Sequence, residues 1–138
     1  PNKIACVLIS TSNPTGTRFQ NLITQDGKSV WQHALDYILE LKEQGVSVCP
    51  ILSSNLEKNY SRGELDIPED IPVLFAGVGA QGGDIQKLQG LLTKENHGVF
   101  VNSSRGLLYS GLDNDWKKAI YLAINQLHVE LQKVRNNE

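Results

Sequence analysis

A glycine-rich loop that directly follows an apolar run constrains the fold of this chain more than any other segment. Residues 73–76, Val-Leu-Phe-Ala, precede the loop glycines Gly77, Gly79 and Gly82, and an amphipathic segment begins at Asp84. This order predicts a strand, a tight turn and the start of a helix. Glycines let the backbone approach a ligand closely, and a helix start offers unpaired N–H groups. The loop therefore indicates an anion site, most often one for phosphate.

A second predicted strand ends on an arginine. Residues 98–104 read Gly-Val-Phe-Val-Asn-Ser-Ser and lead into Arg105. A guanidinium at a strand end is well suited to phosphate oxygens. We expect both strand ends to face one phosphate, with the side-chain amide of Gln81 as a further donor.

The rest of the chain alternates between apolar runs and helical periodicity. Strands are predicted over residues 4–11, 46–52, 73–76 and 99–101, and helices over residues 29–44, 84–94 and 116–134. Residues 12–28 and 53–70 are predicted as loops, with a turn at Asp26-Gly27. Alternating strands and helices give a parallel sheet with helices outside. The predicted fold class is therefore α/β, either half of an α/β barrel, which needs eight strands, or a small open sheet.

The length and net charge of the chain indicate which kinds of domain and partner are expected. The chain has 138 residues, enough for a single domain with its own core, and a net charge of −2. This charge favours neither a nucleic-acid partner nor an anionic membrane. No apolar run approaches the roughly 18 residues of a membrane span. The sequence contains no methionine, so we expect residue 1 not to be a natural start and the chain to be a fragment, a split-gene product or a truncated form.

Two cysteines lie in predicted strands. Cys6 and Cys49 match neither a disulfide framework nor a zinc pattern. We expect both to be buried thiols in a reducing compartment. No metal-ligand cluster and no Ser/His/Asp arrangement stands out; His33 and His128 fall on helices and are expected to be surface or packing residues.

The glycine loop is open to three interpretations. Residues 77–82 match G-x-G-x-x-G, but a dinucleotide site expects an acidic residue about 20 positions on, where this chain has Asn102-Ser-Ser-Arg105. The loop could also be a tight turn without a ligand. The interpretation that we favour is a barrel phosphate site built from the last two strand–helix loops.

The first strand also ends in polar residues. Ser12 and Asn13 follow it and face the same rim, where a hydroxyl and an amide can bind a polar heterocycle. A turn leading into Pro14 explains them equally well. Gln20, further along, has no role that its chemistry alone assigns.

Taken in order, three motifs resemble the C-terminal half of orotidine 5′-phosphate decarboxylases. They are residues 11–14 (Thr-Ser-Asn-Pro), residues 77–84 (Gly-Val-Gly-Ala-Gln-Gly-Gly-Asp) and residues 102–105 (Asn-Ser-Ser-Arg), and the likeness runs from about residue 4 to about residue 110. The resemblance implies that residues 1–138 supply strands 5 to 8 of a TIM (β/α)8 barrel. It also implies a cytoplasmic homodimer that converts orotidine monophosphate to UMP without a metal or an organic cofactor.

The resemblance assigns binding roles residue by residue. It gives Ser12 to the pyrimidine, and Gln81, Ser104 and Arg105 to the phosphate. Asn13, next to Ser12, is expected to bind substrate as well. The phosphate loop would contain Gly77, Gly79 and Gly82. A departure from the family is Ala76, where a proline is usual.

The decarboxylating residues of the family are missing. They are a lysine and an Asp-x-Lys-x-x-Asp motif, whereas Asp26-Gly-Lys28 is followed by Trp31 at the position of the second aspartate. The chain alone is therefore expected to hold no catalytic residue and to be inactive, because preorganised charges generally contribute more to catalysis than any other effect. Its expected partner is the missing N-terminal half of the barrel or a second copy. The alternative is a non-catalytic half-barrel that binds nucleotides or phosphate.

Overall fold

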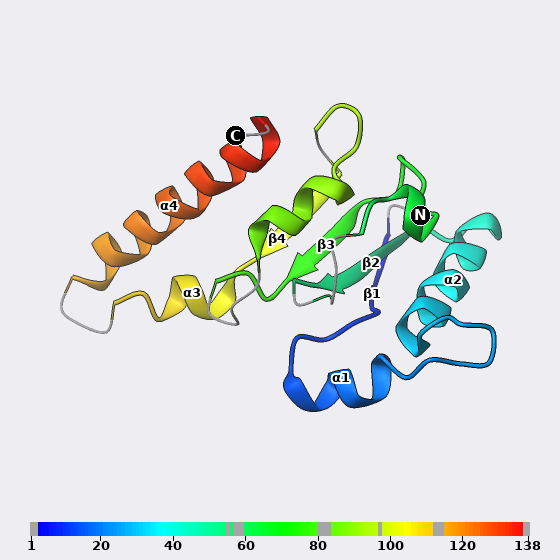
Figure 1. Cartoon of the computed structure of the whole chain (residues 1–138). Coiled ribbons are helices and arrows are strands. Elements are labelled where there is room, and N and C mark those ends of the chain that lie inside the picture. The colour runs from blue at the N-terminus through cyan, green and yellow to red at the C-terminus, as the bar shows by residue number, and fades with distance from the viewer. Residues whose placement is uncertain are drawn as a thin grey trace.

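The fold is built on one parallel sheet. The structure is a computed structural model that describes residues 3–54, 56, 60–79, 84–96, 98–111 and 115–136. Strands β1 (Ala5–Leu8), β2 (Val48–Ser53), β3 (Val73–Ala76) and β4 (Val99–Asn102) lie side by side in chain order (Figure 1). All three pairings are parallel. The predicted α/β class with four parallel strands is confirmed.

Helical segments follow each strand. They are α1 (Pro14–Gln20), α2 (Val30–Glu43), the 3₁₀ helices η1 (Gly63–Leu65) and η2 (Ile85–Leu91), α3 (Ser104–Leu108) and α4 (Trp116–Asn136). A capping box between Ser29 and Gln32 begins α2, as Ser29 predicted, and Gly45 with φ of 87° follows its end. None of the described helices is long and apolar enough to cross a membrane.

The hydrophobic core lies between the helices and one face of the sheet. On that face Leu52, Val73 and Phe75 are fully buried. They pack in one cluster with Trp31 and Leu35 of α2, and with Leu88 and Leu91 of η2. Side chains along a strand point to alternate faces of the sheet with a period of two. The opposite face must therefore carry the intervening residues.

The opposite face of the sheet is apolar, and its residues on the two edge strands are exposed. In register along it lie Leu8 with Ile51, Ile51 with Leu74, and Leu74 with Phe100. Leu8 is 57% exposed and Phe100 is 62% exposed. We call Cys6, Leu8, Ile51, Leu74 and Phe100 the bare face. Among the described residues, the edge strands β1 and β4 each have one side without a paired strand, so the sheet is open at both edges.

Several sequence-based boundaries were wrong. Residues 14–20 form α1 rather than a loop, because Asn13 and Pro14 supply the N-cap and the first turn of a helix. Residues 104–108 form a short helix that was not predicted from the sequence, and the segment after Asp84 is 3₁₀ rather than α-helical. Cys49 is buried as predicted, but its register partner Cys6, on the same face, is exposed because β1 is an edge strand.

A buried arginine joins the amino ends of β3 and β4 to the preceding segments. Arg62 is only 5% exposed. Its guanidinium donates hydrogen bonds to the carbonyls of Leu91 (2.5 Å), Pro68 (2.8 Å), Ile71 (3.0 Å) and Gly98 (3.0 Å). Burial lowers the pKa of this side chain from its usual value. These four bonds give residues 60–72 a fixed path that the apolar pattern of the sequence did not predict.

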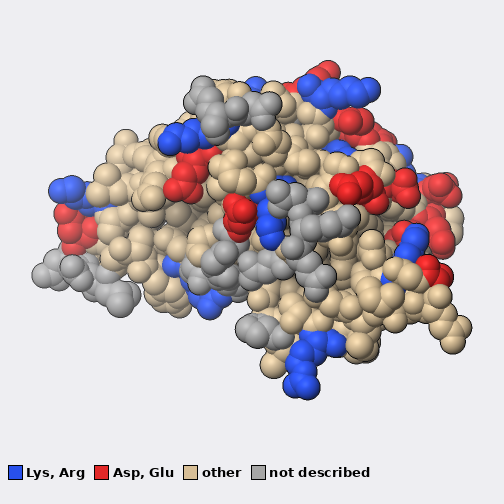
Figure 2. Space-filling view, in the orientation of Figure 1, with Lys and Arg blue, Asp and Glu red and all other residues tan. Residues whose placement is uncertain are grey.

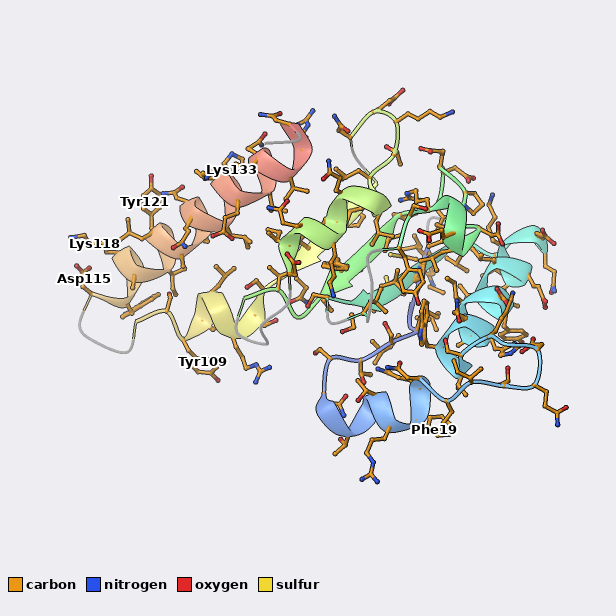
Figure 3. The ribbon with its side chains drawn as sticks, viewed as in Figure 1. Phe19, Tyr109, Asp115, Lys118, Tyr121 and Lys133 are labelled. Carbon is orange, nitrogen blue, oxygen red and sulfur yellow. The ribbon has the colours of Figure 1, made fainter. Side chains whose placement is uncertain are left out.

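Charged side chains of both signs are interspersed over the face shown in Figure 2. On α4, Lys118, Tyr121 and Lys133 point away from the sheet (Figure 3). The inner side of α4 packs on η2, with Leu127, Leu131 and Val134 against the core.

Candidate functional site

A cavity lies at the carboxyl edge of the sheet and opens toward the bare face. Its volume is about 340 Å³. The residues that line it are Leu8, Ser10, Thr11, Ser12, Asn13, Ser53, Ala76, Gly77, Val78, Asn102, Ser104 and Arg105. They come from the ends of all four strands, which in parallel α/β sheets is the edge where ligands bind.

Side-chain hydrogen bonds join the loops after β3 and β4. The hydroxyl of Ser103 donates to the carbonyl of Val78 at 3.1 Å, and the hydroxyl of Ser104 donates to the amide oxygen of Asn102 at 2.8 Å. Gly77 and Gly79 have φ of 94° and 81°, a backbone region that other L-residues rarely adopt. The turn after β3 thus depends on its glycines. Arg105 lies at the end of the neighbouring strand, β4.

The loop after β1 is held by an amide side chain from α1. The N–H of Thr11 donates to Oε1 of Gln20 at 2.9 Å, and Nε2 of Gln20 donates back to the carbonyl of Thr11 at 2.8 Å. The hydroxyl of Thr11 also donates to Oε1 of Gln20 at 3.3 Å. Gln20 does not itself line the cavity. No role was predicted for it from the sequence, because the helix that presents it was not predicted.

A buried serine joins the ends of β1 and β2. Ser10 is 2% exposed, and its hydroxyl oxygen accepts a hydrogen bond of 2.8 Å from the N–H of Ser53. Both residues line the cavity. The hydrogen bond between Ser10 and Ser53 therefore fixes the part of the cavity lining that lies between β1 and β2.

The structure brings together most of the site residues that were predicted from the sequence. Ser12, Asn13, Gly77, Ser104 and Arg105 all line the cavity. Gly79 does not line it but lies beside it, where an added Cβ would be 3.4 Å from Oγ of Ser103. Gln81 and Gly82 lie outside the described residues, so their predicted roles stay predictions.

The Asp26 turn lies away from the cavity. It is a hairpin-like turn, as predicted: Ile23 and Ser29 form an antiparallel bridge, and the carboxylate of Asp26 accepts hydrogen bonds from Thr24 and from the backbone of Lys28. These bonds, with the nearby His33, lower the pKa of Asp26 to about 2. Lys28 pairs with Asp36 on α2 at 2.7 Å. Neither Asp26 nor Lys28 contributes to the cavity lining.

Within the described part of the chain, no group of three or more His, Cys, Asp and Glu side chains could hold a metal ion. His33 lies on the surface of α2, 3.2 Å from Asp26, and His128 is exposed on α4. The cavity therefore offers hydroxyls, amides and one guanidinium. That set suits a ligand with an anionic group and a polar, uncharged ring.

Curated relatives that match the chain are named orotidine 5′-phosphate decarboxylase. The relative from Bordetella pertussis is 29% identical over 130 residues, which cover 94% of this chain and 48% of the relative. The relative from Janthinobacterium sp. is 31% identical over 120 residues, covering 86% of this chain and 44% of the relative. No family model matches the chain.

A solved structure gives the same result for the fold. The orotidine monophosphate (OMP) decarboxylase of Leishmania donovani superposes with a TM-score of 0.72 at 18% identity, covering 98% of this chain and 49% of that one. The expected resemblance is thus confirmed, and the chain spans about half the length of the relatives it matches. Its four strands correspond to half of an eight-stranded barrel.

Proposed function

Since the chain is similar to orotidine 5′-phosphate decarboxylases over about half of their length, we propose that it supplies strands 5 to 8 of such a cytoplasmic enzyme. In this proposal it forms the phosphate site and part of the pyrimidine site for orotidine monophosphate. The observation that carries the proposal is the cavity at the carboxyl edge, lined by residues of all three family motifs.

Each motif contributes a distinct contact. Arg105 binds the phosphate oxygens with its guanidinium, and Gln81 adds an amide donor across the same group. The first turn of α3, which includes Ser104, offers N–H groups without intrahelical partners. Ser12 and Asn13, at the opposite side of the cavity, bind the polar atoms of the pyrimidine.

The decarboxylation step needs residues that this chain does not hold. Loss of CO₂ leaves an electron pair on the ring carbon, which a lysine ammonium stabilises and protonates. Carboxylates position that lysine and disfavour the substrate carboxylate. Phosphate binding can help organise the transition state but cannot supply the proton. The chain alone is therefore inactive in this proposal.

The bare face supports a partner that completes the barrel. Its side chains are apolar: Leu8 and Phe100 are exposed, and Ile51 and Leu74 are half-buried. Two open edges flank it in the described sheet, and an exposed apolar patch of this kind marks an interaction site. The partner is the N-terminal half, which carries the lysine and the carboxylates; a second copy would close the ring but would not add them. The finished barrel would then associate as a homodimer.

Calorimetry on the purified chain tests the binding site. UMP and ribose 5-phosphate should both bind the wild type, and Arg105→Ala should weaken both at least tenfold. Arg135→Ala, an exposed arginine at the end of α4, serves as the matched control and should bind normally. Normal binding by a folded Arg105→Ala variant would contradict the phosphate site.

A turnover assay separates the enzyme part from a binding module. The chain is mixed with strands 1 to 4 of a related decarboxylase, and conversion of orotidine monophosphate to UMP is followed. Activity that requires both halves supports the proposal. A stable complex that binds UMP without turnover would favour the non-catalytic module instead.

A further inference from the structure

The hydrogen bonds between Gln20 and Thr11 fix the backbone next to Ser12. The N–H of Thr11 belongs to the peptide plane before it, and the carbonyl of Thr11 belongs to the plane that also contains the N and Cα atoms of Ser12. Gln20 holds the first group at 2.9 Å and the second at 2.8 Å. With both planes held, the N and Cα atoms of Ser12 are fixed in place beside the cavity.

A close approach of α1 makes this arrangement possible. An added Cβ on Gly16 would lie 2.3 Å from Oγ1 of Thr11 and 2.9 Å from Oδ1 of Asn13. A side chain at this position would force the side chains of Thr11 and Asn13 to move. The first turn of α1 therefore packs directly on the loop, and its last residue, Gln20, reaches back to Thr11.

We propose that Gln20 is a positioning residue for the pyrimidine side of the cavity. This inference rests on the proposed function, because it assumes that Ser12 and Asn13 face the base. Gln20 acts through Thr11, since Thr11 and Ser12 line the cavity and Gln20 does not. The phosphate side is held separately, by the bond between Ser103 and Val78.

The effect of losing the amide is therefore predicted to depend on the ligand. Without the two backbone bonds, the loop samples other conformations and must be ordered when the base binds, which weakens affinity. A ligand that has no base does not need that order. Ribose 5-phosphate provides this comparison, because it keeps the sugar and the phosphate of UMP.

Calorimetry with UMP and with ribose 5-phosphate on the full chain tests the inference. Gln20→Ala should raise the Kd for UMP about tenfold and change the Kd for ribose 5-phosphate less than about twofold. Gln20→Glu keeps the acceptor for the Thr11 N–H but loses the donor to the Thr11 carbonyl. Its Kd for UMP should therefore lie between those of the wild type and Gln20→Ala. Gln44→Ala, an exposed glutamine after α2, is the matched control and should change neither Kd.

The outcomes are distinguishable. Equal weakening of both ligands by Gln20→Ala, or no weakening of either, overturns the inference while the phosphate site stands. If the wild type binds neither ligand, the proposed function falls and this inference falls with it. Thermal unfolding shows whether Gln20→Ala is folded; if it is not, the ratio of the two Kd values in Gln20→Glu decides by the same criterion.

Discussion

The hydroxyl of Ser103 donates a hydrogen bond to the carbonyl of Val78 at 3.1 Å, and thereby holds the loop after β4 against the loop after β3. Both loops contribute to the cavity, through Gly77 and Val78 on one side and Ser104 and Arg105 on the other. The separation between the groups proposed to bind phosphate therefore depends on this side-chain contact.

Replacing Ser103 tests this dependence. Ser103→Ala should weaken UMP and ribose 5-phosphate alike, about fivefold, because a net hydrogen bond contributes about 1 kcal/mol. The hydroxyl of Ser110 makes the same kind of bond, to the carbonyl of Leu107 at 2.8 Å, but Ser110 does not line the cavity. Ser110→Ala is thus the matched control, and calorimetry is the measurement. A loss confined to UMP would contradict the role given to Ser103.

Gly16 provides a test of the loop after β1. Replacing a helical glycine of ordinary φ with alanine usually stabilises a protein by about 0.5–1 kcal/mol. Here the new Cβ would collide with Thr11 at 2.3 Å, so Gly16→Ala should lower the free energy of unfolding and weaken UMP binding. At Gly63 an added Cβ meets nothing within 4 Å, and Gly63→Ala should leave UMP binding unchanged. Urea unfolding measures the stability and calorimetry measures the affinity for UMP. A stabilised Gly16→Ala variant with normal affinity would show that α1 does not pack closely on the loop after β1.

Cys6 reports whether the bare face is covered. It is exposed, whereas Cys49 beside it on β2 is buried and burial raises its pKa to about 11. At a pH of about 8, an alkylating reagent should therefore modify Cys6 and leave Cys49 intact, because the thiolate is the reactive form. Adding the N-terminal half should protect Cys6 in proportion to the complex formed. Mass spectrometry of the labelled peptides measures this, with Cys6→Ala as the unlabelled control; full labelling within an active complex would show that the partner binds elsewhere.

Arg62 should be essential for stability and irrelevant for ligand affinity. Arg62→Ala leaves the buried carbonyls of Leu91, Ile71 and their neighbours without a donor, at about 1–3 kcal/mol for each unsatisfied group. We expect a loss of about 3 kcal/mol or more in the free energy of unfolding. Arg62→Lys should recover only part of it, because one ammonium cannot reach the same set of carbonyls as the fork of a guanidinium. Both variants, measured while folded, should bind UMP normally; weakened affinity would mean that the two ends of the sheet are coupled.

The turn at Asp26 predicts a pH dependence of stability. Hydrogen bonds from Thr24 and Lys28 lower its pKa from 3.8 to about 2. A carboxyl with a lowered folded-state pKa stabilises the fold above its unfolded-state pKa, and this contribution is lost as the pH falls through the folded-state value. The difference in stability between the wild type and Asp26→Asn should therefore shrink between about pH 4 and pH 2. Denaturant unfolding across this range measures it, and a difference that does not change with pH would contradict the assignment.

The sheet and much of the candidate site were predictable from the sequence, because these follow from local patterns. The apolar run of residues 73–76 and the glycine loop after it locate β3 and its turn, and Ser29 and Gly45 mark the ends of α2. The path of residues 60–72 was not predictable, because it depends on carbonyls distant in sequence that converge on Arg62. Gln20 was missed for a related reason: its role requires α1, and the Asn13-Pro14 signal for that helix was interpreted as a turn.

The two sides of the sheet differ in how far this chain covers them. Toward the helices, Phe75, Leu52 and Leu35 complete a tightly packed interior within this single polypeptide. Toward the bare face, Leu8 and Phe100 stay exposed in the described part of the chain. The helical layer is thus packed within this chain, and a second half of the proposed barrel would have to match only the uncovered inner surface of the sheet.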